Sequence, residues 1–121
     1  MCIRDRVFGR PIAQNQGIQF PIAQAYSAMR SAELMLNEAF RLYEAGQNPG
    51  EEANLAKLQS ADASWQAAEA CIQTFGGFGF ATEYNVERKY REARLYQVAP
   101  ISTNLILSYI AEHVLKMPRS Y

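Results

Sequence analysis

The sequence predicts an all-α domain, an antiparallel four-helix bundle, on three observations. Apolar and small residues recur at alternating spacings of three and four over two long stretches, which is typical of helices with one buried face. Glycine, proline and capping residues separate these stretches, and no stretch of useful length alternates as a β-strand would. The connections between the long helices are short, so we expect successive helices to run antiparallel.

The first predicted helix covers residues 11–45, and Gly46 suits the left-handed position that follows a helix. Its length of about 35 residues is typical of a bundle rather than of an isolated surface helix. We expect one apolar stripe of this helix to be buried, formed by Ile18, Ile22, Ala25, Met29, Ala32, Leu36, Ala39 and Tyr43.

The second predicted helix restarts the chain at Asn48, a good N-cap, with Pro49 at the first helical position and Glu51 where a capping box places its acid. It ends at residues 76–79, where three of four residues are glycine. Its expected buried stripe is Leu55, Leu58, Ala61, Trp65, Ala68, Ile72 and Phe75.

Two shorter helices complete the prediction. Asn85 can cap a helix that runs from Val86 to about Arg94. Pro100 interrupts the pattern, and a last helix begins at Ser102 or Thr103 and stops before Pro118.

Composition excludes several classes of function. The 121 residues suffice for one domain, and 12 basic residues balance 12 acidic ones, so no electrostatic case exists for nucleic acid or an anionic membrane. No run approaches the roughly 18 apolar residues of a membrane span. A disulfide between Cys2 and Cys71 is not expected, which indicates a reducing compartment. One histidine and no Cys/His cluster predict no metal site.

Two glycine-containing stretches could bind a ligand. Residues 8–12 lead into the first helix, and from these residues alone the favoured interpretation is a loop with a buried aromatic side chain. Residues 73–80 end the second helix, where glycines allow a phosphate to approach the backbone closely. The alternative for this second stretch is a helix stop with packed phenylalanines, because a dinucleotide fingerprint requires a preceding strand.

Two later stretches also leave two interpretations. Residues 88–94 hold four basic residues, and pairs Glu87–Arg91 and Arg88–Glu92 favour a solvated, salt-bridged helix. Residues 96–104 lead into the last helix, whose N-terminus can bind a carbonyl or a phosphate. Ser102 and Thr103 are explained equally well as helix caps.

The order of these motifs carries a resemblance to a known family. Gln73-x-Phe75-Gly76-Gly77-x-Gly79 is its most specific motif. Along the chain the full set is Phe8-Gly9-x-Pro11-Ile12, Gln14-x-Gln16, the glycine motif, Glu83-Tyr84 and Arg91-Glu92-Ala93. From Phe8 to Tyr121 the chain resembles the C-terminal helical domain of the acyl-CoA dehydrogenases.

The resemblance implies a flavoenzyme of which this chain is a part. It implies non-covalent FAD, removal of two hydrogens from Cα and Cβ of an acyl-CoA thioester, and assembly as a homotetramer or homodimer. Electron-transfer flavoprotein is the implied acceptor, and the bacterial cytoplasm or the mitochondrial matrix the implied location. The fragment alone would be inactive, because it lacks the middle β domain.

Carried onto this chain, the resemblance implies two groups of cofactor contacts. The adenosine and pyrophosphate would meet Gln73, Thr74, Phe75, Gly76 and Gly77. The flavin would meet Ser102, Thr103 and Asn104. Phe8 and Gln16 match positions near the adenine and the dimer contact. A basic residue of the family stands at Asp5 here, with Arg6 one place later as the candidate for the phosphates.

Two departures from the family pattern shape the functional prediction. We hypothesise that residues 1–5 are a non-native leader to a domain of residues 6–121, which resequencing the source locus would test. Pro100 occupies the usual position of the catalytic Glu, and proline cannot abstract a proton. The base is therefore either upstream of residue 1 or absent. An absent base would favour a same-fold desulfinase, oxidase or monooxygenase, and a third alternative is a non-catalytic helical interaction module.

Overall fold

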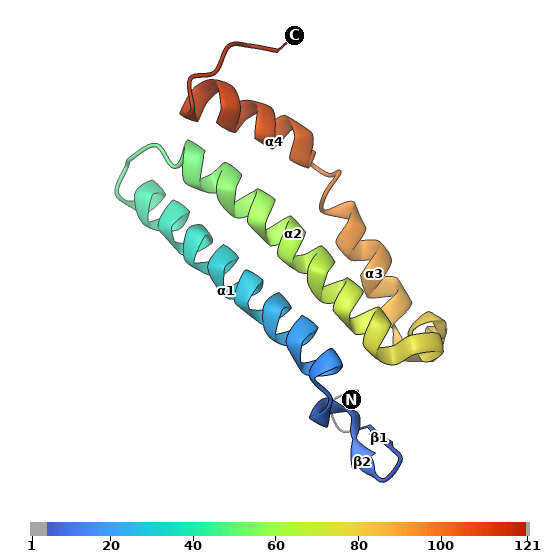
Figure 1. Ribbon diagram of the computed structural model, residues 1–121. Coiled ribbons are helices and arrows are strands. Elements are labelled where there is room, and N and C mark those ends of the chain that lie inside the picture. Colours follow the sequence, from blue (N-terminus) through green and yellow to red (C-terminus); the bar gives the residue numbers. More distant parts are fainter. Residues whose placement is uncertain (1–4, 121) are drawn as a thin grey trace.

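The computed structural model describes residues 5–120 and confirms an all-α domain with four α-helices (Figure 1). Residues 1–4 of the hypothesised leader lie outside the described residues. The helices are α1 (Gln16–Glu44), α2 (Gly50–Phe75), α3 (Val86–Leu95) and α4 (Thr103–Tyr109). Short 3-10 turns cover Gly76–Phe80 and Thr82–Tyr84 between α2 and α3. Among residues 5–120, no helix is both long enough and apolar enough to cross a membrane.

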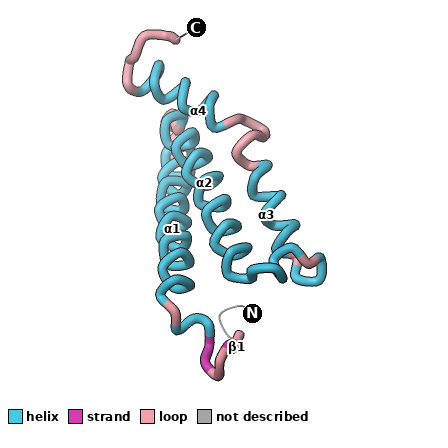
Figure 2. Tube along the Cα trace, turned by 45° about the vertical axis from the view of Figure 1, so that its right-hand side comes forward, coloured by secondary structure: helices cyan, strands magenta, loops and turns pink. Residues whose placement is uncertain are grey.

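Helices α1 and α2 form the antiparallel hairpin that dominates the fold. Figure 2 shows α2 between α1 and α3, with α4 across the end of the hairpin where α1 meets α2. The buried contact between α1 and α2 is made by alanines at a spacing of seven, a set that we call the alanine seam: Ala25, Ala32, Ala39, Ala56, Ala63 and Ala70. Small side chains let the two helices approach closely.

The predicted apolar stripes are only partly buried. On α1 the alanines of the stripe are buried, but Met29 is 48% exposed, Leu36 42% and Tyr43 72%. The physical reason is that α1 packs almost entirely against α2, so only the line of residues facing α2 is covered. On α2 the stripe residues Ala61 and Ile72 are buried, and Trp65 is half-buried.

The connection between α1 and α2 confirms Gly46 as the residue that ends the helix. Gly46 has φ +68°, its N–H donates to the Tyr43 carbonyl at 3.0 Å, and the Gln47 N–H donates to the Leu42 carbonyl at 2.9 Å. These two bonds are those of a Schellman motif. The start of α2 lies one residue later than predicted. Pro49 takes the cap position, while Asn48 Oδ1 still accepts the Gly50 N–H at 3.0 Å.

The start of the first helix was predicted five residues too early. Residues 11–15 instead hold the end of a two-stranded ribbon, β1 (Arg6–Val7) with β2 (Arg10–Pro11), and a 3-10 turn at Ile12–Gln14. Asn15 is extended because its amide donates to the Ile12 carbonyl at 3.0 Å and its Oδ1 accepts from Arg10 at 2.8 Å. This short ribbon was not expected from the sequence.

The two later helices begin close to their predicted positions. Asn85 precedes α3 in a left-handed conformation (φ 57°), but its side chain makes no capping bond. Ser102 caps α4, since its Oγ accepts the Leu105 N–H at 3.3 Å.

The helical path of α4 continues beyond Tyr109 as a π turn at Ile110–Val114. It then closes with two backbone bonds around Lys116, which has φ 57°. The Leu115 N–H donates to the Ile110 carbonyl and the Met117 N–H to the Ala111 carbonyl, both at 2.9 Å. The last helix therefore ends before Pro118, as the sequence predicts.

Candidate functional site

The glycine turn after α2 combines an open part with a packed part. Gly76 (φ 57°) and Gly77 are exposed, and a Cβ placed on either would meet no atom within 4 Å. Gly79 is buried, and a Cβ there would lie 2.9 Å from Ile72 Cγ1 and 3.1 Å from the Ile72 carbonyl. A ligand can therefore approach the backbone at Gly76 and Gly77, whereas Gly79 is needed for packing.

The aromatic residues of this turn are only partly packed. Phe75 is half-buried, with its ring centroid 5.6 Å from that of Tyr84. Phe78 is also 5.6 Å from Tyr84 but is 67% exposed, and Phe80 is 73% exposed. The interpretation as a stop of packed phenylalanines is thus correct for Phe75 and wrong for Phe80.

The last turn of α2 presents two polar side chains next to the glycines. The exposed Gln73 amide donates to Glu69 Oε1 at 3.4 Å. Thr74 Oγ1 donates to the Ala70 carbonyl at 2.6 Å, so its proton is used within the helix and its oxygen can only accept from a ligand.

The N-terminal ribbon and the start of α1, which together hold the predicted contact residues Arg6, Phe8 and Gln16, lie at the same end of the hairpin as the glycine turn (Figure 1). Phe8 lies at its tip with φ 52° and is 100% exposed, so the interpretation as a loop with a buried aromatic side chain is wrong. The Arg6 guanidinium donates to the Gly9 carbonyl at 2.5 Å. Gln16 is the exposed first residue of α1.

The start of α4 lies at the opposite end of α3 from the glycine turn (Figure 1). Ser102 and Thr103 are half-buried, and Asn104 is exposed. The Thr103 N–H already donates to the Gln97 carbonyl at 3.1 Å, and Ser102 Oγ is engaged as the cap. The capping interpretation is therefore confirmed for Ser102. Pro100, ahead of this turn, is exposed.

Helix α3 carries the ion pairs that the sequence predicts. Glu87 and Arg91 lie 2.8 Å apart, and Arg88 and Glu92 lie 3.6 Å apart. The hydrogen bond from Lys89 at 2.7 Å holds the pKa of Glu92 below its ordinary value. The basic partner of each pair is more than half exposed, so the pairs stabilise the helix only slightly.

An aromatic and cationic cluster joins α3 to α2. The ring centroids of Trp65 and Tyr90 are 4.6 Å apart, and the Arg94 guanidinium carbon lies 5.4 Å from the Trp65 centroid. Burial raises the pKa of the Tyr90 phenol, with a contribution from a hydrogen bond to Glu69. The sequence marks Trp65 as a core residue but does not indicate these partners.

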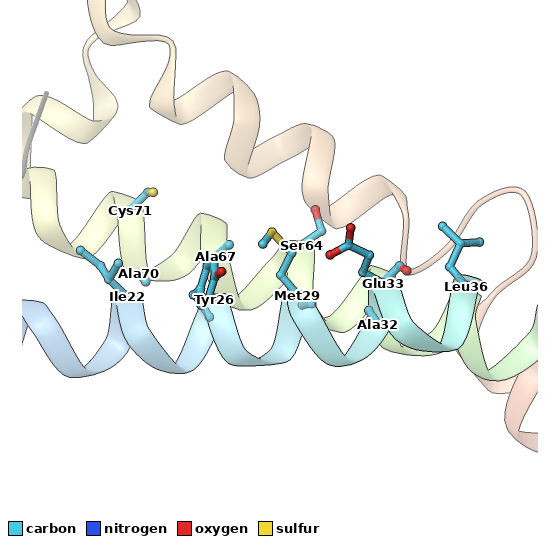
Figure 3. A pocket seen from close by; sticks show the side chains of 13 residues that line it. Ile22, Tyr26, Met29, Ala32, Glu33, Leu36, Ser64, Ala67, Ala70 and Cys71 are labelled. Carbon is cyan, nitrogen blue, oxygen red and sulfur yellow. The ribbon is translucent and has the colours of Figure 1, made fainter. Parts of the chain in front are cut away.

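An apolar groove of about 630 Å³ runs along one side of the α1–α2 hairpin. Figure 3 shows side chains that line it from both helices, among them Tyr26, Met29 and Leu36 of α1 and Ser64 and Cys71 of α2. A second groove of about 530 Å³ continues it toward the α1–α2 turn, past Phe40 and Tyr43. Leu36 and Ser60 line both, so the two form one apolar trough.

Metal ligands do not converge in the part of the chain that the structure describes. Within residues 5–120, no group of three or more His, Cys, Asp or Glu side chains could hold a metal ion. Cys71 lies exposed on α2, and Cys2 falls outside the described residues.

Comparison with protein families gives a match over nearly the whole chain. The family model described as the C-terminal domain of acyl-CoA dehydrogenase matches residues 1–115. Acyl-CoA dehydrogenase FadE12 of Mycobacterium tuberculosis is 39% identical over 118 residues, which are 96% of this chain and 30% of that protein. The mitochondrial short-chain specific acyl-CoA dehydrogenase of Sus scrofa is 37% identical over 116 residues, 95% of this chain and 28% of the relative.

Solved structures share the fold. The glutaryl-coenzyme A dehydrogenase in its glutaryl-CoA complex superposes with a TM-score of 0.86 at 28% identity, covering 98% of this chain and 30% of the other. The FAD complex of PigA gives a TM-score of 0.88 at 22% identity, covering 93% and 30%, and shows likeness of fold alone. The chain thus spans about 30% of the length of the proteins that it resembles.

Proposed function

The chain belongs to the acyl-CoA dehydrogenase family, a family of flavoprotein oxidoreductases, and from this we propose that it serves as the FAD-contacting and oligomerisation domain of such an enzyme. The whole enzyme would remove two hydrogens from Cα and Cβ of an acyl-CoA thioester. Bound FAD would accept the β hydrogen as a hydride. Electron-transfer flavoprotein would then accept the electrons.

The open backbone at Gly76 and Gly77 carries the proposal for FAD. Both glycines are exposed with free space where a side chain would stand, so a pyrophosphate can come close to the backbone there. The Gly76 N–H is already bonded to the Ile72 and Gln73 carbonyls at the end of α2. Gln73 adds an amide donor beside them. The Thr74 hydroxyl donates its proton to the Ala70 carbonyl and therefore has no donor left for a phosphate. The donor set is neutral, so a counter-charge for the phosphates falls to Arg6 or to residues beyond this chain.

The two groups of proposed contacts are separated by the length of α3. Its 10 helical residues span roughly 15 Å, so the glycine turn and the start of α4 are too far apart for one small ligand. An extended dinucleotide, or two cofactors held by neighbouring subunits, suits this spacing. The Phe8 ribbon joins the first group, at the glycine-turn end of the hairpin.

The chemistry at Pro100 favours a base outside this chain. Proline has neither an acidic proton nor a backbone N–H, so this position can neither abstract the α proton nor donate to a thioester carbonyl. We place the base upstream of residue 1. If no such base exists upstream, Pro100 instead favours the second candidate, a flavoenzyme of the same fold with other chemistry.

The apolar trough supports the proposed role in assembly. Its lining is mostly hydrocarbon, and Met29, Phe40 and Tyr43 beside it are 48%, 57% and 72% exposed. An apolar surface of this kind is characteristic of a face that another part of a protein covers. We propose a homotetramer or homodimer, which light scattering of the full-length protein tests.

A substitution at Gly77 tests the cofactor site without disturbing the fold. Leucine at this position would project into open space, so the free energy of unfolding should stay unchanged, while FAD would lose its approach to the backbone. We expect the full-length Gly77→Leu protein to bind FAD at least about tenfold more weakly, the equivalent of about 1.4 kcal/mol. The exposed Ala23→Leu substitution on α1 is the matched control. Equal FAD affinity in both variants would exclude a contact at the glycine turn.

Acyl-CoA titration separates the two candidate chemistries. A yellow full-length protein whose flavin absorbance bleaches with acyl-CoA esters supports the dehydrogenase. A yellow protein that none of them bleaches supports the other flavoenzymes. A colourless full-length protein would contradict both and favour the non-catalytic interaction module.

A further inference from the structure

Gln97 lies in the connection between α3 and α4 and contacts both α2 and α4. Its side-chain amide Nε2 donates to Asp62 Oδ1 of α2 at 3.1 Å. Its backbone carbonyl accepts the N–H of Thr103, the first residue of α4, at 3.1 Å. One half-buried residue therefore links the middle of α2 to the beginning of the last helix.

The orientation of the Gln97 amide is fixed by a third partner. Arg94 donates from its guanidinium to Gln97 Oε1, so the Nε2 end of the amide must point to the Asp62 carboxylate. Arg94 is itself positioned over the Trp65 ring, with its guanidinium carbon 5.4 Å from the centroid. Gln97 and Arg94 therefore contact Asp62 and Trp65, respectively. These two residues lie three positions apart on the same helix, α2.

A neighbouring contact holds the same connection from its other side. Lys57 of α2 donates from its ammonium group to the carbonyl of Tyr96, the residue before Gln97. The Val98 and Ala99 N–H groups both donate to the Leu95 carbonyl, at 3.0 and 2.9 Å. The connection is thus bonded to α2 at residues 96 and 97. Through its backbone carbonyl, Gln97 is also bonded to the first residue of α4.

We propose that Gln97 is a positioning residue, which with Asp62 sets where the first turn of α4 stands relative to α2. This inference rests on the proposed function, because the first turn of α4, with Ser102 and Thr103, is the proposed contact for the flavin. Gln97 itself does not touch the cofactor. Its role is to hold the backbone that does.

The test replaces each end of the link in the full-length protein. Gln97→Met keeps the length of the side chain and removes both amide bonds, and Asp62→Ala removes the acceptor. Asp62→Asn keeps an acceptor oxygen for Gln97 and should restore wild-type behaviour. Gln66→Met is the matched control, because Gln66 is exposed one turn further along α2 and its side chain makes no hydrogen bond among the described residues.

Hydrogen exchange measures the positioning directly, without flavin. In flavin-free protein we expect the Thr103 amide, followed on peptides covering residues 97–104, to exchange about fivefold faster in Gln97→Met and in Asp62→Ala, the effect of about one lost hydrogen bond. The double variant should be no faster than either single one, because both break the same link. The Gln66→Met protein should exchange as the wild type does.

The flavin measurements extend the test to the proposed site. We expect Gln97→Met and Asp62→Ala to bind FAD about fivefold more weakly and to shift the visible absorption band of the bound flavin, which a loss of stability alone would not do. Exchange in Gln97→Met equal to that in Gln66→Met would overturn the inference, as would faster exchange with an unchanged flavin spectrum. A wild-type protein that binds no flavin would instead contradict the proposed function, and the exchange result would still decide whether Gln97 positions α4.

Discussion

The two contacts that α2 makes on its opposite sides are built from different chemistry. Toward α1 it presents the alanine seam, in which no side chain is larger than a methyl group. Toward α3 and the connection that follows it, α2 presents Trp65, Asp62 and Lys57, each with a specific aromatic, cationic or hydrogen-bonding partner. We call this second surface the α2–α3 contact. The seam brings two long helices close together, whereas the α2–α3 contact fixes the position of short ones.

This difference separates what the two contacts can tolerate. In the seam, the volume of each residue matters, because each of the six alanines is at most 8% exposed. In the α2–α3 contact, the chemical identity and orientation of each partner side chain matter. The side chains there are half-buried or exposed, so water can replace part of an interaction that a substitution removes. We therefore expect stability to depend chiefly on the seam and cofactor geometry chiefly on the α2–α3 contact.

The largest expected effect on stability comes from overfilling the seam. Ala32 is 4% exposed, so Ala32→Leu would push α1 away from α2, and we expect a loss of about 3 kcal/mol in the free energy of unfolding. Ala23→Leu, on the exposed side of the same helix, should change it by less than about 0.5 kcal/mol. Denaturant unfolding of the two full-length variants makes the comparison. Equal losses would mean that the seam is not closely packed.

A smaller effect is expected from the α2–α3 contact. Trp65→Leu removes the ring contact with Tyr90 and the position of Arg94 over the indole, so we expect a loss of about 1 to 2 kcal/mol. Trp65→Phe keeps an aromatic ring beside Tyr90, so its loss in the free energy of unfolding should be about half that of Trp65→Leu. The measurement is again denaturant unfolding. A larger loss than that of Ala32→Leu would reverse the ranking of the two contacts.

The smallest effect is a pH dependence on the solvated face of α3. The Lys89 hydrogen bond lowers the pKa of Glu92 in the folded protein, so the pair stabilises the fold above the ordinary glutamate pKa of about 4.3 and stops doing so as pH falls through the lowered value. Near neutral pH, the denaturant midpoint of unfolding should be slightly higher for the wild type than for Glu92→Gln. The difference should shrink as pH falls below the ordinary glutamate pKa and vanish in acid, where Glu92 is protonated in the folded protein as well. A difference that persisted there would show that Glu92 acts by something other than its charge.

Local signals predicted the helices because each helix end depends on residues nearby in the sequence. Gly46 and Ser102 act where the sequence placed them, and the ion pairs of α3 follow from its i,i+4 spacing. The start of α1 was wrong because Asn15 and Arg10 bind each other and hold the chain extended, a contact that helical periodicity does not reveal. The ribbon of Arg6–Val7 and Arg10–Pro11 is too short to show an alternation.

The seam and the α2–α3 contact depend on residues far apart, and the sequence did not predict either. The stripe on α1 contains both alanines and large residues, and which of them is buried depends on where α2 lies. Gln97 and Asp62 are 35 residues apart, and nothing in the spacing of either indicates the other. At the glycine turn, the motif predicted the open residues Gly76 and Gly77, but the packing of Gly79 against Ile72 required the structure.

The seven-residue repeat of the alanine seam has a consequence for register. A slide of α2 along α1 by seven residues, roughly 10 Å, would set most of the alanines opposite alanines again, so the seam by itself specifies spacing but not alignment. The five residues between Glu44 and Gly50, closed by the Schellman bonds at Gly46, are too few to allow such a slide. The turn therefore sets the register of the two helices. A longer turn would allow a second register, shifted by seven residues, in which alanines again pack against alanines.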